Sequence, residues 1–121
     1  MKKKILLVED DPFLVDIYST KLKKAGFKIE VVRDGSLVLD KLKEVRPDLV
    51  VLDIVLPNFN GWEVLTKIQQ KFGANKFKII ILSNLGQKSD IQRGLSLGAV
   101  KYLIKARYTP SEIVEEIKKV I

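Results

Sequence analysis

The sequence of 121 residues contains no cysteine and no histidine. Without cysteine it has no disulfide, no thiolate metal ligand and no thiol nucleophile, which fits a reducing compartment. Without histidine it has no imidazole metal site, no Ser-His-Asp triad and no phosphohistidine of its own. Any chemistry must therefore come from carboxylates, hydroxyls and lysines.

Long hydrophobic runs are also missing. The main apolar stretches lie at residues 5–8, 49–52 and 79–82, whereas a membrane-spanning helix needs roughly 20 apolar residues. Only four apolar residues separate the basic start of the chain from Glu9, too few for the hydrophobic region of a signal peptide. We therefore expect a cytoplasmic protein that does not associate with membranes.

The chain does have the composition of a globular protein, with 46% hydrophobic and 31% charged residues. Its length is that of one domain, and we expect residues 1–121 to form a single core. The net charge is +7, but the lysines are scattered and no aromatic residues interleave with them. We interpret them as solvated helix faces and strand starts, and we expect no direct binding of nucleic acid.

Short apolar runs alternate five times with segments of helical periodicity. The predicted strands lie near residues 4–8, 27–32, 48–52, 77–82 and 100–104, and the predicted helices near 12–25, 36–45, 61–72, 87–97 and 110–120. This alternation predicts an α/β fold in which helices cover both faces of a five-stranded parallel sheet. Asp11 before Pro12 predicts the start of the first helix, Gly26 its end, and Thr109 with Glu112 a capping box on the last.

Polar side chains stand where four of the predicted strands end, and ligands of open parallel sheets bind at that edge. In chain order these residues are Glu9 and Asp10, then Asp53, then Ser83 and Asn84, and finally Lys105. Three carboxylates at ~4 Å would repel by about 4 kcal/mol per pair at an effective dielectric constant of 20. A divalent cation would relieve this repulsion, and an all-oxygen ligand set favours Mg²⁺.

Ordinary interpretations also exist for these residues and for the neighbouring Asp11 and Tyr102; Glu9 and Asp10, for example, could belong to a plain acidic loop. Asp11 is best explained as a helix cap, Ser83 could cap the loop after its strand, and Lys105 could be a solvated lysine. Tyr102 could simply pack against the core. Asp53 is harder to dismiss, because a charge at the end of a buried strand must be compensated.

Taken together, these residues resemble the response-regulator receiver domains of two-component signalling, which are CheY-like proteins. The resemblance covers essentially the whole chain and rests on Glu9, Asp10, Asp53 with Pro57 and Gly61, Ser83, Gly98, Ala99, Tyr102 and Lys105. It implies a flavodoxin-like (βα)5 fold with strand order 2-1-3-4-5.

The resemblance also implies roles. Asp53 would accept a phosphoryl group from a histidine kinase or histidine phosphotransfer protein, while Ser83 and Lys105 bind phosphoryl oxygens. Mg²⁺ would be held by Asp10, Asp53 and the Val55 carbonyl, with Glu9 acting through water. Ser83 and Tyr102 would then switch the face formed by the fourth helix, fifth strand and fifth helix. A downstream partner or a second copy of the chain would read that face.

Three residues depart from the family pattern: Asn84 beside the phosphoryl site, Gly94 inside the fourth helix and Ala106 in place of the usual proline. Interior glycine costs about 0.5–1 kcal/mol relative to alanine, so we expect a loosened fourth helix. The family's Lys-Pro bond is cis, and we predict that the bond between Lys105 and Ala106 is cis as well, although this costs about 2.5–4 kcal/mol.

Three other functions compete with the signalling switch. A metal-dependent phosphatase could use Asp53 as its nucleophile, but Val55 stands where a second acid is needed. A flavin-binding electron carrier shares the fold, but Glu9 and Asp10 would repel its phosphate. A protein-interaction scaffold that works without phosphorylation is the more serious alternative.

Overall fold

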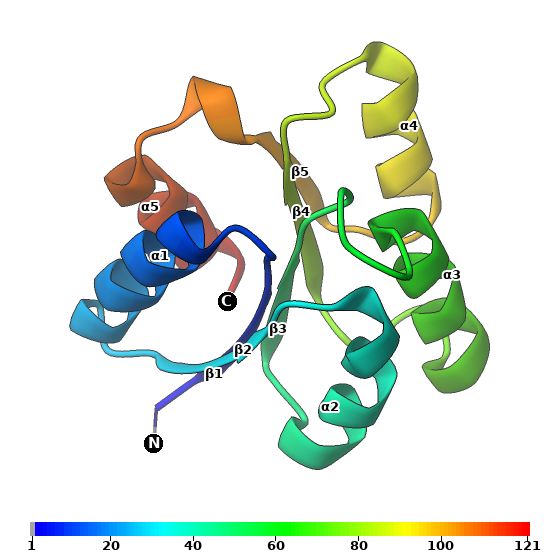
Figure 1. Ribbon diagram of the computed structural model, residues 1–121, viewed down its shortest axis with the longest axis horizontal. Coiled ribbons are helices and arrows are strands. Elements are labelled where there is room, and N and C mark those ends of the chain that lie inside the picture. Colours follow the sequence, from blue (N-terminus) through cyan, green and yellow to red (C-terminus); the bar gives the residue numbers. More distant parts are fainter. Residues whose placement is uncertain (1) are drawn as a thin grey trace.

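The computed structural model describes residues 2–121 and has a central parallel sheet with helices on both sides (Figure 1). Its strands are β1 (Lys4–Val8), β2 (Lys28–Val32), β3 (Leu49–Leu52), β4 (Ile79–Ser83) and β5 (Lys101–Ile104). Its helices are α1 (Pro12–Lys24), α2 (Val38–Val45), α3 (Gly61–Phe72), α4 (Lys88–Ser96) and α5 (Pro110–Val120). The sheet order is β2-β1-β3-β4-β5, which confirms the predicted fold.

The helix starts follow the predicted capping signals. The Asp11 carboxylate accepts hydrogen bonds from the backbone amides of Phe13 and Leu14 at the start of α1. Thr109 and Glu112 form the reciprocal capping box of α5. At the end of α1, Gly26 adopts φ 99°, a left-handed conformation that glycine reaches without strain.

Most boundaries lie within one residue of the predicted ones, and two elements differ by more than that. The predicted second helix divides into a short 3₁₀ turn, Gly35–Leu37, followed by α2. The Asp34 carboxylate accepts from the Ser36 backbone amide and favours this tighter turn. The fourth strand begins two residues later than predicted and includes Ser83, whose register partner is Ile104 of β5.

The sheet divides the core into two layers (Figure 1). On one face, α1 and α5 cover side chains such as Leu7, Val51 and Leu103. On the other face, α2, α3 and α4 cover side chains such as Val50 and Ile81. Because β1, β3 and β4 are buried on both faces, their carboxyl ends are held rigidly at one edge of the sheet.

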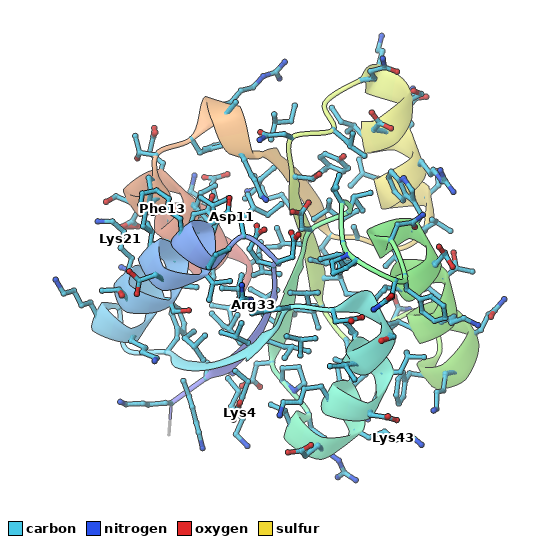
Figure 2. All side chains as sticks on the ribbon, viewed as in Figure 1. Lys4, Asp11, Phe13, Lys21, Arg33 and Lys43 are labelled. Carbon is cyan, nitrogen blue, oxygen red and sulfur yellow. The ribbon has the colours of Figure 1, made fainter. Side chains whose placement is uncertain are left out.

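The lysines are distributed over several elements. Lys4 begins β1, Lys21 lies on α1 and Lys43 lies on α2, and Figure 2 shows their side chains on different sides of the molecule. These three positive charges therefore lie apart from one another. Among residues 2–121, no helix is long and apolar enough to cross a membrane.

Candidate functional site

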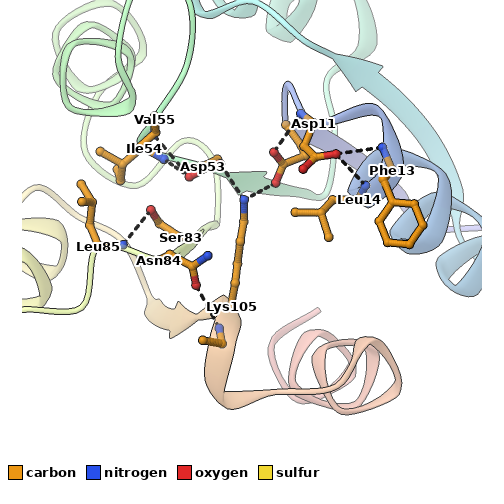
Figure 3. A network of polar contacts seen from close by, with 12 residues as sticks. Asp11, Phe13, Leu14, Asp53, Ile54, Val55, Ser83, Asn84, Leu85 and Lys105 are labelled. Atoms are coloured by element: carbon orange, nitrogen blue, oxygen red, sulfur yellow. Dashed lines mark hydrogen bonds and ion pairs between the residues drawn. The ribbon is translucent and has the colours of Figure 1, made fainter.

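The carboxyl ends of the strands meet around a pocket of about 300 Å³. All the polar residues predicted for the site line this pocket, except Tyr102: they are Glu9, Asp10, Asp53, Ser83, Asn84 and Lys105, with Val55 beside them. Asp53 comes from the end of β3 and Lys105 from the end of β5, and Figure 3 shows their side chains pointing toward one another. The topology thus brings together residues that lie up to 96 positions apart, from Glu9 to Lys105.

Three acids of the pocket form a tight cluster. Carboxylate oxygens of Glu9, Asp10 and Asp53 lie within 4.8 Å of one another. Glu9 is 2% exposed to solvent and Asp53 is 5% exposed, whereas Asp10 lies on the surface. Charges this close repel, and burial of two of them reduces the screening by water.

Lys105 partly neutralises the cluster. Its ammonium lies 2.5 Å from Glu9 Oε1 and 2.7 Å from Asp53 Oδ2. Burial lowers the pKa of Lys105, but the hydrogen bonds to Asp53 and Glu9, together with the negative charges of these two residues, raise the pKa above its usual value. Burial also raises the pKa of Glu9; the Asp53 charge adds to this rise, and the hydrogen bond from Lys105 opposes it.

The Asp53 carboxylate is fixed in orientation. Its Oδ1 accepts hydrogen bonds from the backbone amides of Ile54, at 2.7 Å, and Val55, at 3.3 Å, while Oδ2 faces Lys105. Gly61 packs closely against this turn, and a Cβ at that position would lie 2.5 Å from the Asp53 carbonyl oxygen. Only glycine allows α3 to start this close to the acidic residue.

Ser83 and Tyr102 meet at the backbone of one residue, Leu85. The fully buried Ser83 Oγ accepts from the Leu85 amide at 3.3 Å, and the Tyr102 hydroxyl donates to the Leu85 carbonyl. Burial raises the pKa of Tyr102 to about 12, with contributions from the charges of Asp90 and Asp53. Tyr102 therefore lies behind the loop that follows β4 and does not line the pocket.

The prediction of a cis bond between Lys105 and Ala106 is wrong. Residues 2–121 contain no cis peptide bond, and Lys105 still reaches Asp53. The Ala106 amide donates to Asn84 Oδ1 at 3.0 Å, a bond that proline could not make. With alanine in place of proline the bond favours trans by about 2.5–4 kcal/mol, and the hydrogen bond to Asn84 adds a contact to the trans turn.

The sequence interpretation missed two contacts. Arg33 follows β2, and its guanidinium donates to the Asp10 carbonyl at 3.3 Å. The strand-end rule would have found it, since it also stands at the carboxyl end of a strand. The direct ion pair between Glu9 and Lys105 was also not predicted, because sequence spacing does not show which of several nearby acids a lysine will pair with.

The site has the donor set that Mg²⁺ requires. Three carboxylates against one ammonium leave two negative charges, and the pocket offers oxygen but no sulfur or imidazole ligands. One of the acids, Asp10, is exposed and can reach an ion from solvent. An acidic cluster of this kind is typical of the Mg²⁺ site of receiver domains.

Comparison with known proteins agrees with this architecture. The family model described as "Response regulator receiver domain" matches residues 5–118. The DNA-binding response regulator MtrA of Mycolicibacterium smegmatis is 36% identical over 118 residues, which cover 98% of this chain and 50% of MtrA. The chain spans about half the length of the curated relatives it matches.

Solved structures show the same fold. A CheY-like receiver domain protein of Methanospirillum hungatei is 27% identical with a TM-score of 0.87, covering 98% of this chain and 93% of the other. The BeF3-activated receiver domain of Klebsiella pneumoniae RstA is 26% identical with a TM-score of 0.86, covering 96% of each chain. The family model, the relatives and the solved structures all match nearly the whole of this chain. The chain therefore belongs to the response regulator receiver domains, which are signalling proteins of two-component systems and not enzymes.

Proposed function

We propose that Asp53 is the phosphoryl acceptor of this receiver domain. The observation that carries the proposal is the convergence on one open pocket of a fixed Asp53 carboxylate, two further acids, Lys105 and Ser83. An Asp53 carboxylate oxygen would attack the phosphorus of a phosphohistidine. The new P–O bond forms as the P–N bond breaks, and the histidine of the donor leaves with the electron pair.

The residues of the pocket divide into two groups in this proposal. Asp10, Asp53 and the Val55 carbonyl would hold Mg²⁺ directly, and Glu9 would act through water. When bound, the ion supplies positive charge against phosphoryl oxygens. Lys105 supplies a second positive charge, and the Ser83 hydroxyl a neutral hydrogen-bond donor.

Phosphorylation would add about −1.5 to −2 charge at Asp53. Ser83 Oγ accepts from the Leu85 amide and keeps its own proton to donate, so a move of Ser83 toward a phosphoryl oxygen would pull on the Leu85 amide. The Tyr102 hydroxyl donates a hydrogen bond to the carbonyl of the same Leu85 and would move with it. The output is then a population shift on the face of α4, β5 and α5, read by a partner or a second copy.

Residues 1–121 contain no histidine, so the donor histidine lies outside them; we infer that it belongs to a histidine kinase or a histidine phosphotransfer protein. The downstream partner is an unknown protein or effector domain; MtrA, a relative, is named a DNA-binding regulator. We infer that residues 1–121 act as one cytoplasmic receiver unit that does not itself bind nucleic acid or membrane.

Incubation with a small phosphodonor and Mg²⁺, followed by mass spectrometry, tests the proposal. The expected result is one labile phosphoryl adduct on Asp53 that is lost in Asp53→Asn and kept in Asp16→Asn, a control at an exposed acid of α1. Labelling of the Asp53→Asn variant would overturn the assignment of the acceptor. Absence of labelling in the wild type would favour a scaffold that works without phosphorylation.

A further inference from the structure

The peptide unit between Lys105 and Ala106 is held at both of its polar atoms. The Lys105 carbonyl accepts from the Tyr108 amide at 3.3 Å, and the Ala106 amide donates to Asn84 Oδ1 at 3.0 Å. The first bond is local and belongs to the 3₁₀ turn Lys105–Arg107. The second comes from a side chain 22 residues earlier in the chain.

Asn84 stands where the sheet stops. The last register pair of β4 and β5 joins Ser83 to Ile104, so the next residues, Asn84 and Lys105, lie beyond the backbone ladder. There the hydrogen bond between the Asn84 side chain and the Ala106 amide replaces the backbone hydrogen bonds of the sheet. Without it, the segment after Ile104 would be tied to β4 only through residues that precede Lys105.

The position of this segment matters because Lys105 starts from it. The Lys105 side chain is 10% exposed and places its ammonium between Glu9 Oε1 and Asp53 Oδ2, at 2.5 and 2.7 Å. Two short contacts to two different strands leave little freedom for the Cα position. A rotation of the peptide plane after Lys105 would tilt the whole side chain away from one of the two carboxylates.

We propose that Asn84 is a positioning residue that aims Lys105 at the acceptor by fixing the Ala106 amide. Its role in phosphoryl transfer rests on the proposed function of Asp53 and Lys105, whereas its role in holding Lys105 does not. Asn84 acts through the backbone of its neighbour, and the proposal assigns it no contact with the phosphoryl group. The chain thus holds its trans Lys-Ala step with an amide side chain.

The first part of the test uses the unphosphorylated protein and NMR. In Asn84→Ala we expect exchange of the Ala106 amide to accelerate by about tenfold, as for loss of one hydrogen bond. We also expect the Lys105 ammonium signal, protected from water while it is ion-paired, to broaden. Asn84→Asp keeps an acceptor oxygen at the same place and should restore the Ala106 protection. Asn75→Ala, at an exposed asparagine, should change neither signal.

Unchanged Ala106 exchange in Asn84→Ala would overturn the proposal, and so would faster exchange with an unaltered Lys105 signal. The second part measures the rate of labelling by the phosphodonor, which should fall by about three- to tenfold in Asn84→Ala and stay unchanged in Asn75→Ala. An unchanged rate in Asn84→Ala would overturn the role in transfer. If the wild type does not label at all, the proposed function fails, and the NMR signals still decide whether Asn84 holds Lys105.

Discussion

Replacing Asp53 with asparagine should stabilise the metal-free protein while removing the proposed phosphoryl acceptor. The structure allows the opposing contributions to be compared. At an effective dielectric constant of 20, attraction between Asp53 and Lys105 at 2.7 Å is about 6 kcal/mol. Repulsion from Glu9 and Asp10, with oxygens within 4.8 Å, is at least about 3.5 kcal/mol for each pair before screening.

These charge contributions nearly cancel, so the burial of Asp53 decides the sign. Asp53 is 5% exposed, and removing an ion from water costs several kcal/mol even after relaxation of the protein. An asparagine carries no charge, and its Oδ1 can still accept from the Ile54 amide. Lys105 keeps Glu9 as its partner. We therefore expect Asp53→Asn to raise the free energy of unfolding by about 1–3 kcal/mol, after a discount for solvent around Asp10.

Urea unfolding with and without Mg²⁺ measures this effect. A Mg²⁺ concentration ten times its Kd should stabilise the wild type by about 1.4 kcal/mol and Asp53→Asn by less. The difference in free energy of unfolding between the two proteins should therefore become smaller when Mg²⁺ is added. The control Asp16→Asn should change stability by less than about 0.5 kcal/mol and show no dependence on Mg²⁺. A destabilised Asp53→Asn, or one that differs from the wild type as little as the control does, would refute the reasoning.

Three further predictions concern α4 and Tyr102. Gly94→Ala should destabilise the protein by about 1 kcal/mol, because its Cβ would lie 2.6 Å from Ile81 Cδ1 and 2.8 Å from Tyr102 Cδ2 and overpacking outweighs the gain in helix propensity. A urea midpoint that rises instead would contradict this, and Ser96→Ala at the exposed end of α4 serves as the control. Amide hydrogen exchange should be faster in α4 than in α1 and α5, since Gly94 is its one buried residue; equal protection would count against it. The pKa of Tyr102 is raised to about 12 from 10, so the unfolded chain releases this proton first. Stability should therefore fall as the pH rises from 10 through 12, and an equally steep fall in Tyr102→Phe would show that another group is responsible.

The sequence was sufficient to predict the sheet and the pocket, because both follow from local rules. Apolar runs of strand length alternate with capped helices, and this fixes the parallel topology. Once the topology is known, the residues after Val8, Leu52, Leu82 and Ile104 must meet at one edge of the sheet. The resemblance to receiver domains added the strand order and the individual roles.

The features that the sequence did not predict depend on contacts between distant segments. The side chain that binds the Ala106 amide belongs to Asn84, which is remote in the chain. The need for glycine at position 35 comes from Phe59, whose carbonyl oxygen lies where a Cβ would be. Gly94 was interpreted as a residue that loosens α4, but the structure adds a packing reason for it, since its surface faces Ile81 and Tyr102.

This packing also shows how a change at Ser83 would travel. Ser83 Oγ accepts from the amide of Leu85 and the Tyr102 hydroxyl donates to the carbonyl of the same residue, so a displacement of Leu85 would alter both hydrogen bonds. Leu85 precedes the start of α4 by three residues, and the Gln87 amide there donates to the Asp90 carboxylate. The Tyr102 ring meanwhile lies against Gly94 in the same helix. A displacement of Leu85 would therefore act on α4 at its first turn, through the backbone, and at its middle, through Tyr102. Because interiors are close-packed, the helix would shift as a unit rather than absorb the change locally.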